Sequence, residues 1–560
     1  MKEKIIKLVF GPQKASQIQH AIQPPDTSVN ELKVSLAQEY PIRHIPITAA
    51  TTTTAADQTK TESKESLKAR RAWTNWAKNQ TCHPLKTLQP RTLEDVVEIV
   101  KNAKADNNKI RCVAGGYTWS STSVVDDDGL LVFVNKMTKI YTPVYDESQG
   151  WTVELETGVT VGALDKFLQR HDPPLAMPSN IVMETACLGG ILALGSHGAA
   201  THSRTLSDLA CEVKIVDATG TLNTFTRDKD PVEFSAAACN LGLLGVIYSY
   251  TLRVEPMFNL IATDTYPPRA HYFDCPKMGG ARLKEMILGS DQTHILYWPF
   301  NNQFNRETKN QDKVQKQGGG GAIDELWVKQ WKRTDLPETK SALWKSIRMV
   351  RQHIGSICGN MTFEIMSAHP KLTPLVNHLI STKFRSKSEK VLAAPDAIHY
   401  QRNLQAAACV GLECVFKVDE GFENPVRALN FAIAKIHEYA ERGEFPMNVT
   451  LDMRFIKASN QIMSYAYDKD SETIFCTMEM LSAANTKGFE EFAVTVAQHW
   501  MHEFQARPHW AKLWEHISGI VPYLREQAEP QLKQFESIRK KYDPNGMFMN
   551  KTFAGVLGHS

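Results

Sequence analysis

The segment TLDMRF holds a carboxylate and a guanidinium, Asp452 and Arg454, two residues apart. Its period-2 alternation predicts a strand, on which residues two apart point to the same face. In a pocket, such a pair can bind a polyol or a lactone and stabilise charge that develops on its oxygens. The same spacing also fits an ordinary ion pair on a solvated sheet face, so both interpretations stay open at this point.

A glycine-rich segment near residue 115 could hold a phosphate group. Residues 110–114 (IRCVA) are predicted as a buried strand, which Gly115 and Gly116 end before the hydroxyl-rich run YTWSSTS. Paired glycines allow close approach to the main chain, and successive N–H groups with flanking hydroxyls can bind an anion. The pattern predicts a pyrophosphate-binding loop, with a Gly-Gly hairpin turn as the alternative. It is not a nicotinamide fingerprint, because the GxGxxG spacing is missing.

A second glycine-rich run covers residues 181–198 (IVMETACLGGILALGSHG). Glycines this dense in an apolar run are costly unless another group approaches the backbone. His197 and His202 lie close together in the sequence, but no carboxylate or further histidine accompanies them. We therefore predict a structural histidine in a glycine-rich wall and no metal site.

Helices and strands predicted around these motifs would hold them in place. Thr92 caps an amphipathic helix that leads into the 110–114 strand. Further strands are predicted at residues 129–134, 151–158, 213–216, 248–254 and 450–455, and a further helix at 160–172.

Length and composition favour an enzyme-sized intracellular protein of two or three domains. The net charge of +3 gives no indication of a nucleic-acid partner, and ten cysteines without a CxxC pair favour reduced thiols. No apolar run approaches the ~20 residues of a membrane span, and the N-terminal apolar stretch is too short for a signal peptide. We expect a cytoplasmic or organellar protein that is not secreted, with peripheral membrane association left open.

The N-terminal region is predicted to be separate from the rest of the chain. Residues 1–45 form an extension whose predicted strand, strand and helix resemble the first half of a ubiquitin-like domain. Residues 46–70 are Thr-rich and polar and cannot bury a core, so they are predicted as a disordered linker.

The order of the motifs resembles the vanillyl-alcohol oxidase superfamily of PCMH-type FAD-linked oxidases, and within it the sugar-1,4-lactone oxidase group. The matching segments are AGGYTW, the GG-(x)4-GSHG pattern ending at residue 198, NLGLLGVI, the HWAK tetrapeptide and the turn YDPNGMF. The resemblance implies an α+β fold with a two-subdomain FAD-binding domain at residues 71–256. An α+β substrate (cap) domain at 257–560 would follow, with its C-terminus returning to the flavin domain.

The resemblance implies FAD as the cofactor. In the family, a histidine after the Gly-Gly turn commonly bonds to the flavin 8α-methyl, whereas this chain has Tyr117 there. We therefore predict FAD held without a covalent bond, with Tyr117 near the dimethylbenzene edge. The implied cofactor contacts are Arg111, Gly115, Gly116, Tyr117, Thr118, Trp119, Ser120, Gly189, Gly190, Gly195, Ser196, His197, Gly198, Gly245, Val246 and Ile247.

Four catalytic residues follow from the same resemblance: Asp452, Arg454, His509 and Lys512. Family members usually show Glu-x-Arg where this chain has Asp452 and Arg454, so the carboxylate here is one methylene shorter. The family's His-Trp-x-Lys motif lies beside flavin and substrate. A cation near the flavin N1–C2 carbonyl stabilises the negative charge that the ring gains in hydride transfer.

Together these features predict an FAD-dependent oxidoreductase that oxidises a hydroxyl of a sugar lactone by hydride transfer to flavin N5. The electron acceptor is O2 or another molecule, so oxidase and dehydrogenase both remain possible. One alternative is an alditol or secondary-alcohol oxidase of the same fold. The other is a non-catalytic flavin-fold protein that acts through interactions.

Overall fold

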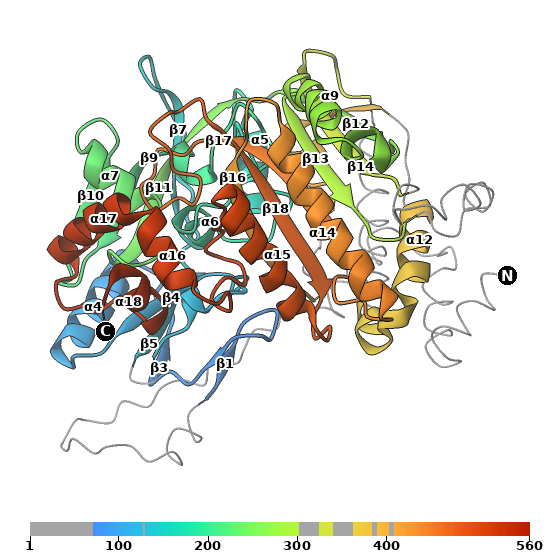
Figure 1. Ribbon diagram of the computed structural model, residues 1–560. Coiled ribbons are helices and arrows are strands. Elements are labelled where there is room, and N and C mark those ends of the chain that lie inside the picture. The colour runs from blue at the N-terminus through green and yellow to red at the C-terminus, as the bar shows by residue number, and fades with distance from the viewer. Residues whose placement is uncertain are drawn as a thin grey trace, which may run out of the picture. The chain divides into compact units, whose positions relative to one another are not determined.

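The computed structural model describes residues 71–126, 129–301, 324–339, 362–383, 389–401 and 408–559, which fall in one compact unit, Ser63–Ser560. Their helices and strands confirm the α+β prediction (Figure 1). The extension predicted at 1–45 and the linker predicted at 46–70 lie outside the described residues. Among the helices that are described, none is long and apolar enough to cross a membrane.

The first layer is a small parallel sheet with the order β3-β5-β4, preceded by the β1–β2 hairpin. Thr92 caps helix α4 and forms a capping box with Asp95, as its sequence predicts. Val96 and Val100 of α4 pack on this sheet. The bounds are β1 (Trp73–Thr74), β2 (Thr81–Cys82), β3 (Lys86–Leu88), α4 (Leu93–Ala105), β4 (Ile110–Val113) and β5 (Leu130–Phe133).

The second layer is an antiparallel sheet with the order β10-β9-β11-β7-β6, and β8 pairs with β11 outside this path. Val216 and Val246 of this sheet share a core cluster with α4, so the first two layers pack on each other. The bounds are β6 (Val144–Asp146), β7 (Gly150–Glu156), α5 (Val161–Gln169), β8 (Leu175–Ala176), α6 (Leu188–Ala193), β9 (Ala210–Val216), β10 (Leu222–Thr226), α7 (Pro231–Ala238) and β11 (Val246–Pro256).

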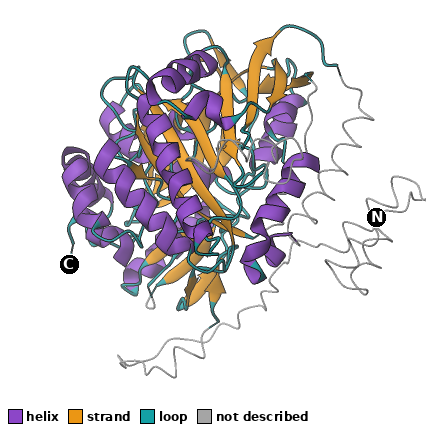
Figure 2. Ribbon diagram, turned by 45° about the vertical axis from the view of Figure 1, so that its right-hand side comes forward, coloured by secondary structure: helices purple, strands orange, loops and turns teal. Residues whose placement is uncertain are grey.

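The third layer is an eight-stranded sheet with the order β15-β12-β14-β13-β17-β18-β16-β19. The long helices α14 and α15 run across one face of it (Figures 1 and 2). The bounds are β12 (Asn259–Thr265), α8 (Arg269–Phe273), α9 (Pro276–Leu288), β13 (Gln292–Tyr297), β14 (Trp327–Thr334), α12 (Thr373–Lys383), β15 (Lys390–Ala393), α13 (Ala394–Ile398), β16 (Cys409–Lys417), α14 (Glu423–Glu441), β17 (Leu451–Lys457), β18 (Ile474–Ala483), α15 (Phe489–Phe504) and β19 (Arg507–Pro508).

The C-terminal segment returns to the first layer through α16 (Ile520–Gln527), α17 (Glu529–Tyr542) and α18 (Lys551–Leu557). Ile110 N–H donates to the Met547 carbonyl at 2.8 Å, and Phe548 is fully buried in the α4 core cluster. The YDPNGMF turn therefore anchors the end of the chain on the sheet that carries the first glycine loop.

Candidate active site

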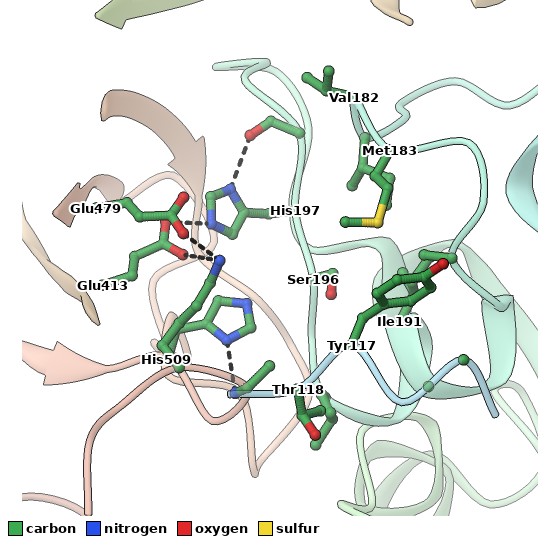
Figure 3. Close-up of a pocket in the computed structure, with 18 of the residues that line it drawn as sticks. Tyr117, Thr118, Val182, Met183, Ile191, Ser196, His197, Glu413, Glu479 and His509 are labelled. Carbon is green, nitrogen blue, oxygen red and sulfur yellow. Dashed lines mark hydrogen bonds and ion pairs between the residues drawn. The ribbon is translucent and has the colours of Figure 1, made fainter. Parts of the chain in front are cut away.

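A cavity of about 860 Å³ is lined both by the glycine-rich segments and by the eight-stranded sheet. Figure 3 shows His197, Glu413, Glu479 and His509 on one side, and Tyr117, Val182, Met183 and Ile191 on the other. The sequence-predicted residues that line the cavity are Arg111, Gly115, Gly116, Tyr117, Thr118, Trp119, Gly189, Gly190, Ser196, His197, Gly198, Gly245, Ile247, Asp452, Arg454, His509 and Lys512.

Three predicted cofactor contacts, Ser120, Gly195 and Val246, do not line the cavity. The Ser120 hydroxyl donates to the Trp510 carbonyl at 2.6 Å, and the Gly195 carbonyl accepts from the Tyr465 hydroxyl. Val246 points into the core. These residues therefore support the wall of the cavity and do not face its interior.

Arg111 lines the cavity, but its guanidinium is occupied by hydrogen bonds to backbone carbonyls of the protein. It donates to the carbonyls of Gly242, Phe548, Leu241 and Thr122. Its role is to join the first glycine segment to the C-terminal return, and burial lowers its pKa to about 10.

The space beside each glycine of the second segment indicates whether a dinucleotide could approach this wall of the cavity. A Cβ on Gly189 would lie 2.6 Å from Thr157 Cβ, and one on Gly198 would lie 2.6 Å from the Asn180 carbonyl oxygen. Those two glycines are required by the protein's own packing. A Cβ on Gly190 would meet nothing within 4 Å, although this residue lines the cavity. Gly116 has φ of +68°, which permits the turn that opens the first loop. The wall therefore has the open backbone that a flavin nucleotide needs.

Three carboxylates stand directly opposite one another on adjacent strands of the large sheet. Asp452 of β17 pairs with Glu479 of β18, which pairs with Glu413 of β16. All three are buried, and like charges in this arrangement repel one another. The row must therefore be held by cations.

Arg454 and Lys512 supply two of those cations. Arg454 Nη2 lies 2.7 Å from Glu479 Oε2 and 3.4 Å from Asp452 Oδ2. Lys512 Nζ pairs with Glu479 and lies 3.8 Å from Glu413 Oε2. Burial disfavours the charged form of Arg454, but Glu413 and Glu479 more than compensate and raise its pKa. The predicted Asp452–Arg454 pair is thus part of a larger buried charge network.

His197 also contacts the carboxylate row. Its Nδ1 lies 2.9 Å from the Gly198 carbonyl and its Nε2 lies 3.0 Å from Glu413 Oε1. Burial opposes ionisation of Glu413, but His197 and Lys512 hold its pKa well below the usual value. His197 thus joins the second glycine-rich segment to the carboxylate row. Arg454 and Lys512 provide the positive charges shared by the three buried carboxylates.

His509 carries no charge. The Ala511 backbone N–H donates to its Nδ1 at 3.1 Å, so the ring proton is on Nε2. Burial lowers the pKa of His509 well below 6.5, against the attraction of Glu413. Ligand atoms of His197, Glu413 and His509 lie within 4.8 Å of one another, a spacing that metal sites also show. The backbone partners already fix the protons of both rings, so we interpret the group as a hydrogen-bonded cluster.

The buried neutral histidine gives a testable pH dependence of stability. Unfolded His509 titrates near pH 6.5, whereas the folded ring titrates well below, so the unfolded state binds the extra proton. Stability is fully present above about pH 6.5 and falls as pH drops toward the folded pKa, by up to about 1.4 kcal/mol per pH unit. In His509→Gln, urea unfolding of the apoprotein between pH 7.5 and 5 should show a shallower slope. His502→Gln, at an exposed site on α15, should keep the wild-type slope. Equal slopes in all three proteins would contradict a neutral buried His509.

Sequence reasoning missed Glu413, Glu479, His294 and Tyr400, which also line the cavity. Tyr400 Oη lies 2.8 Å from His294 Nδ1, and His294 Nε2 lies 3.0 Å from Asp452 Oδ2. A signal for the two glutamates was present: each is a single charged residue inside an apolar strand. Such residues are almost never fully buried unless they are paired.

Tyr117 occupies the place where the resembled family commonly has its attaching histidine. Its ring packs edge-on against Trp76 at 5.8 Å between centroids, and burial raises its pKa. A neighbouring aromatic, Trp119, lies under the Lys512 ammonium at 4.4 Å from its ring centroid. The first glycine loop and the HWAK segment are therefore in direct contact.

Comparison with protein families gives two matches that divide the chain. Residues 84–226 match the FAD binding domain, and residues 251–556, more than half of the chain, match the D-arabinono-1,4-lactone oxidase family. The first match ends with β10, and the second begins within β11, the last strand before the eight-stranded sheet.

Curated relatives match nearly the whole chain at low identity. L-gulono-1,4-lactone dehydrogenase from Mycobacterium tuberculosis is 22% identical over 491 residues, covering 87% of this chain and 99% of the relative. L-gulonolactone oxidase from Scyliorhinus torazame is 24% identical over 490 residues, covering 86% and 97%. Among solved structures, cholesterol oxidase from B. sterolicum superposes with a TM-score of 0.68 at 17% identity, covering 87% of this chain and 96% of that one. The last likeness confirms the predicted PCMH-type fold.

Proposed function

Because the chain belongs to the D-arabinono-1,4-lactone oxidase family, we propose that it oxidises a hydroxyl of a sugar 1,4-lactone to a carbonyl. It is an FAD-linked oxidoreductase that acts on a CH–OH donor. When bound, FAD supplies the hydride acceptor, at N5 of its ring. We further propose that residues 71–256 form the FAD-binding domain and residues 257–560 the substrate domain. The observation that carries the proposal is the buried row of three carboxylates with Arg454 and Lys512, which shares one cavity with the glycine-rich wall.

The glycine-rich wall is the proposed cofactor site. Gly115, Gly116 and Gly190 expose backbone at which a pyrophosphate or ring can approach, and Thr118 adds a hydroxyl donor. Tyr117 stands at the attachment position without an imidazole nucleophile. We therefore propose that FAD is held by non-covalent contacts alone.

The charged row is the proposed substrate site. Arg454 lines the cavity, and its guanidinium is held in place by Asp452 and Glu479. Lys512 and Arg454 are each shared with Glu479, which fixes both cations against the floor of the cavity. A lactone presents hydroxyl donors to the carboxylates and a carbonyl acceptor to these cations. Fixed charges of this kind also stabilise charge that develops on the reacting oxygen.

An alditol is the second substrate class to test, because its hydroxyls would meet the same carboxylates and cations. It lacks the ring carbonyl, so it would leave one donor of the Arg454–Lys512 pair unsatisfied, which costs binding energy. We therefore expect lactones to reduce the enzyme with higher kcat/KM than alditols of equal length.

The first experiment has two readings from one preparation. Acid precipitation of the FAD-loaded protein should leave yellow FAD in the supernatant, because no covalent bond holds it. The loaded protein is then mixed anaerobically with D-arabinono-1,4-lactone, L-gulono-1,4-lactone or an alditol while the 450-nm region is followed. We expect bleaching by the lactones. Re-oxidation with O2 or with an artificial acceptor then separates an oxidase from a dehydrogenase.

For each of the two measurements, one outcome would contradict the prediction that it tests. Yellow colour that stays in the pellet would contradict non-covalent attachment and leave the activity untouched. If alditols alone bleached the flavin, the proposed substrate class would change from a lactone to a polyol. A flavoprotein that none of these donors bleaches would favour the non-catalytic alternative.

A further inference from the structure

We propose that Tyr400, aligned by His294 and Asp452, accepts the proton of the substrate hydroxyl and passes its own proton to His294. This inference rests on the proposed function, since it concerns the proton that leaves when a CH–OH group becomes a carbonyl. It assigns Tyr400 as a catalytic residue and His294 as the group behind it, and neither lies in a sequence motif. Asp452, which aligns His294, belongs to the TLDMRF motif.

The three side chains form a continuous hydrogen-bonded line in the cavity wall. Tyr400 follows α13, His294 lies on β13, and Asp452 lies on the neighbouring strand β17. The Tyr400 Oη to His294 Nδ1 distance is 2.8 Å, and the His294 Nε2 to Asp452 Oδ2 distance is 3.0 Å. All three are buried and all three line the cavity.

The direction of each hydrogen bond follows from the charge on Asp452. Burial opposes its ionisation, but His294 and Arg454 hold its pKa below the usual value. An ionised carboxylate only accepts, so Nε2 of His294 carries the ring proton and donates it to Asp452. Nδ1 then has the lone pair and accepts the Tyr400 hydroxyl proton. The phenol oxygen in turn offers acceptor lone pairs to a hydroxyl in the cavity.

The other histidines that line the cavity cannot do this. Both nitrogens of His197 are engaged, one with the Gly198 carbonyl and one with the Glu413 carboxylate, so neither faces a hydroxyl group. The Nδ1 lone pair of His509 is occupied by the Ala511 N–H, and its Nε2 carries the proton. Among the described cavity-lining histidines, His294 is therefore the one whose ring lone pair faces a hydroxyl group.

Oxidation of the CH–OH group removes one hydride and one proton from the substrate, and the proton is relayed through Tyr400 to His294. The substrate C–H bond breaks and its electron pair leaves as hydride for the bound FAD, the acceptor that the family's activity supplies. The substrate O–H bond breaks as its proton moves to Tyr400 Oη, and the original Tyr400 proton moves to His294 Nδ1. The C=O bond forms, and His294 becomes an imidazolium beside the Asp452 carboxylate. No tyrosinate is required, which agrees with a Tyr400 pKa raised well above 10 by burial.

Burial and the neighbouring charges keep the His294 ring neutral, so that it can accept a proton. Burial lowers its pKa, Asp452 opposes that effect, and Arg454 and Lys329 lower the pKa further. Lys329 Nζ lies 4.3 Å from the Tyr400 ring centroid and pairs with Asp264 at 2.5 Å, so its charge is partly compensated. The ring is neutral at pH 7 and becomes half of an ion pair on accepting the proton.

The first test is anaerobic flavin reduction in Tyr400→Phe at saturating lactone. General acid–base catalysis typically contributes 10²–10⁴-fold, so we expect the reduction rate to fall by at least about a hundredfold. The wild-type rate should fall at acid pH as His294 becomes protonated, with an inflection below pH 6.5 because the pKa of His294 is lowered. This inflection should be absent in His294→Gln. Tyr297→Phe is the matched control, because Tyr297 is equally buried and bonds the Asp324 carboxylate at 2.6 Å outside the cavity. It should keep the wild-type rate and pH profile.

A second measurement does not depend on turnover. The His294 Nε2–H held by Asp452 should give a strongly deshielded imidazole resonance in the proton NMR spectrum of the apoprotein, present in Tyr400→Phe and absent in His294→Gln. Absence of this resonance in the wild type would overturn the proton assignment. A wild-type rate and pH profile in Tyr400→Phe would overturn the relay alone. Failure of every CH–OH donor to reduce the wild type would overturn both the relay and the proposed function.

Discussion

Arg454→Met is expected to slow reduction of the flavin by a lactone by at least about a hundredfold and to lower the free energy of unfolding by about 3–5 kcal/mol. The guanidinium is shared by Asp452 and Glu479, and Glu413 also contributes to raising its pKa. Methionine removes one of the two basic side chains, Arg454 and Lys512, that pair with the three buried carboxylates. An uncompensated buried charge is what makes the loss of one partner so costly. The measurements are stopped-flow reduction of the loaded protein and urea unfolding of the apoprotein.

Two further variants separate charge from geometry at this position. Arg454→Lys keeps the charge but not the planar fork, so it should recover most of the stability and little of the rate. Arg333→Met removes an arginine from β14 of the same sheet, where the side chain is 37% exposed and pairs with Glu255. It should cost no more than about 1 kcal/mol and leave the rate unchanged. An Arg454→Met protein as stable as Arg333→Met would contradict the dependence of the buried carboxylates on this guanidinium.

Gly190→Leu is expected to weaken FAD binding by at least about a hundredfold, which is about 2.7 kcal/mol, without destabilising the apoprotein. Gly190 lies inside α6, where leucine is the better helix former, and a Cβ there would meet nothing within 4 Å. The added side chain would project into space that the cofactor needs. Isothermal titration of the apoprotein with FAD gives the affinity, and urea unfolding gives the stability.

Gly189→Ala is the contrasting variant one residue earlier in the same helix. Its Cβ would press on Thr157 at 2.6 Å from Cβ and 2.8 Å from the carbonyl oxygen. It should destabilise the apoprotein by roughly 1–3 kcal/mol. If Gly190→Leu bound FAD as tightly as the wild type, the wall beside Gly190 would not be the cofactor site.

Local patterns predicted the parts of the site that are contiguous in the chain. The strand that ends at Gly115, the helix capped by Thr92 and the shared face of Asp452 and Arg454 all depend on short-range spacing, and the structure has all three. The burial of the Asp452–Arg454 pair could not be predicted this way. It depends on the layers that cover the sheet, which the strand's own alternation does not reveal.

The partners of that pair come from strand order, which a single sequence does not specify. Glu413 meets Glu479 only because β16 pairs with β18, and His294 meets Asp452 across 158 residues because β13 pairs with β17. The motifs also predicted cofactor contacts at three residues that do not line the cavity. Ser120, Gly195 and Val246 share segments with cavity residues but point away, because a glycine-rich run does not reveal which residues face the ligand.

The C-terminal return has a consequence for biosynthesis. The loop that begins at Tyr117 is held by residues that are made roughly four hundred positions later: Trp119 N–H donates to the Ala511 carbonyl, and the Asn550 side chain donates to the Ser121 carbonyl. Domains generally fold as units from the N-terminus during synthesis. Here the first glycine loop gains these two contacts only once Ala511 and Asn550 have been made. We therefore expect a chain shortened before Asn550 to hold this loop, and the cavity wall that it forms, less firmly.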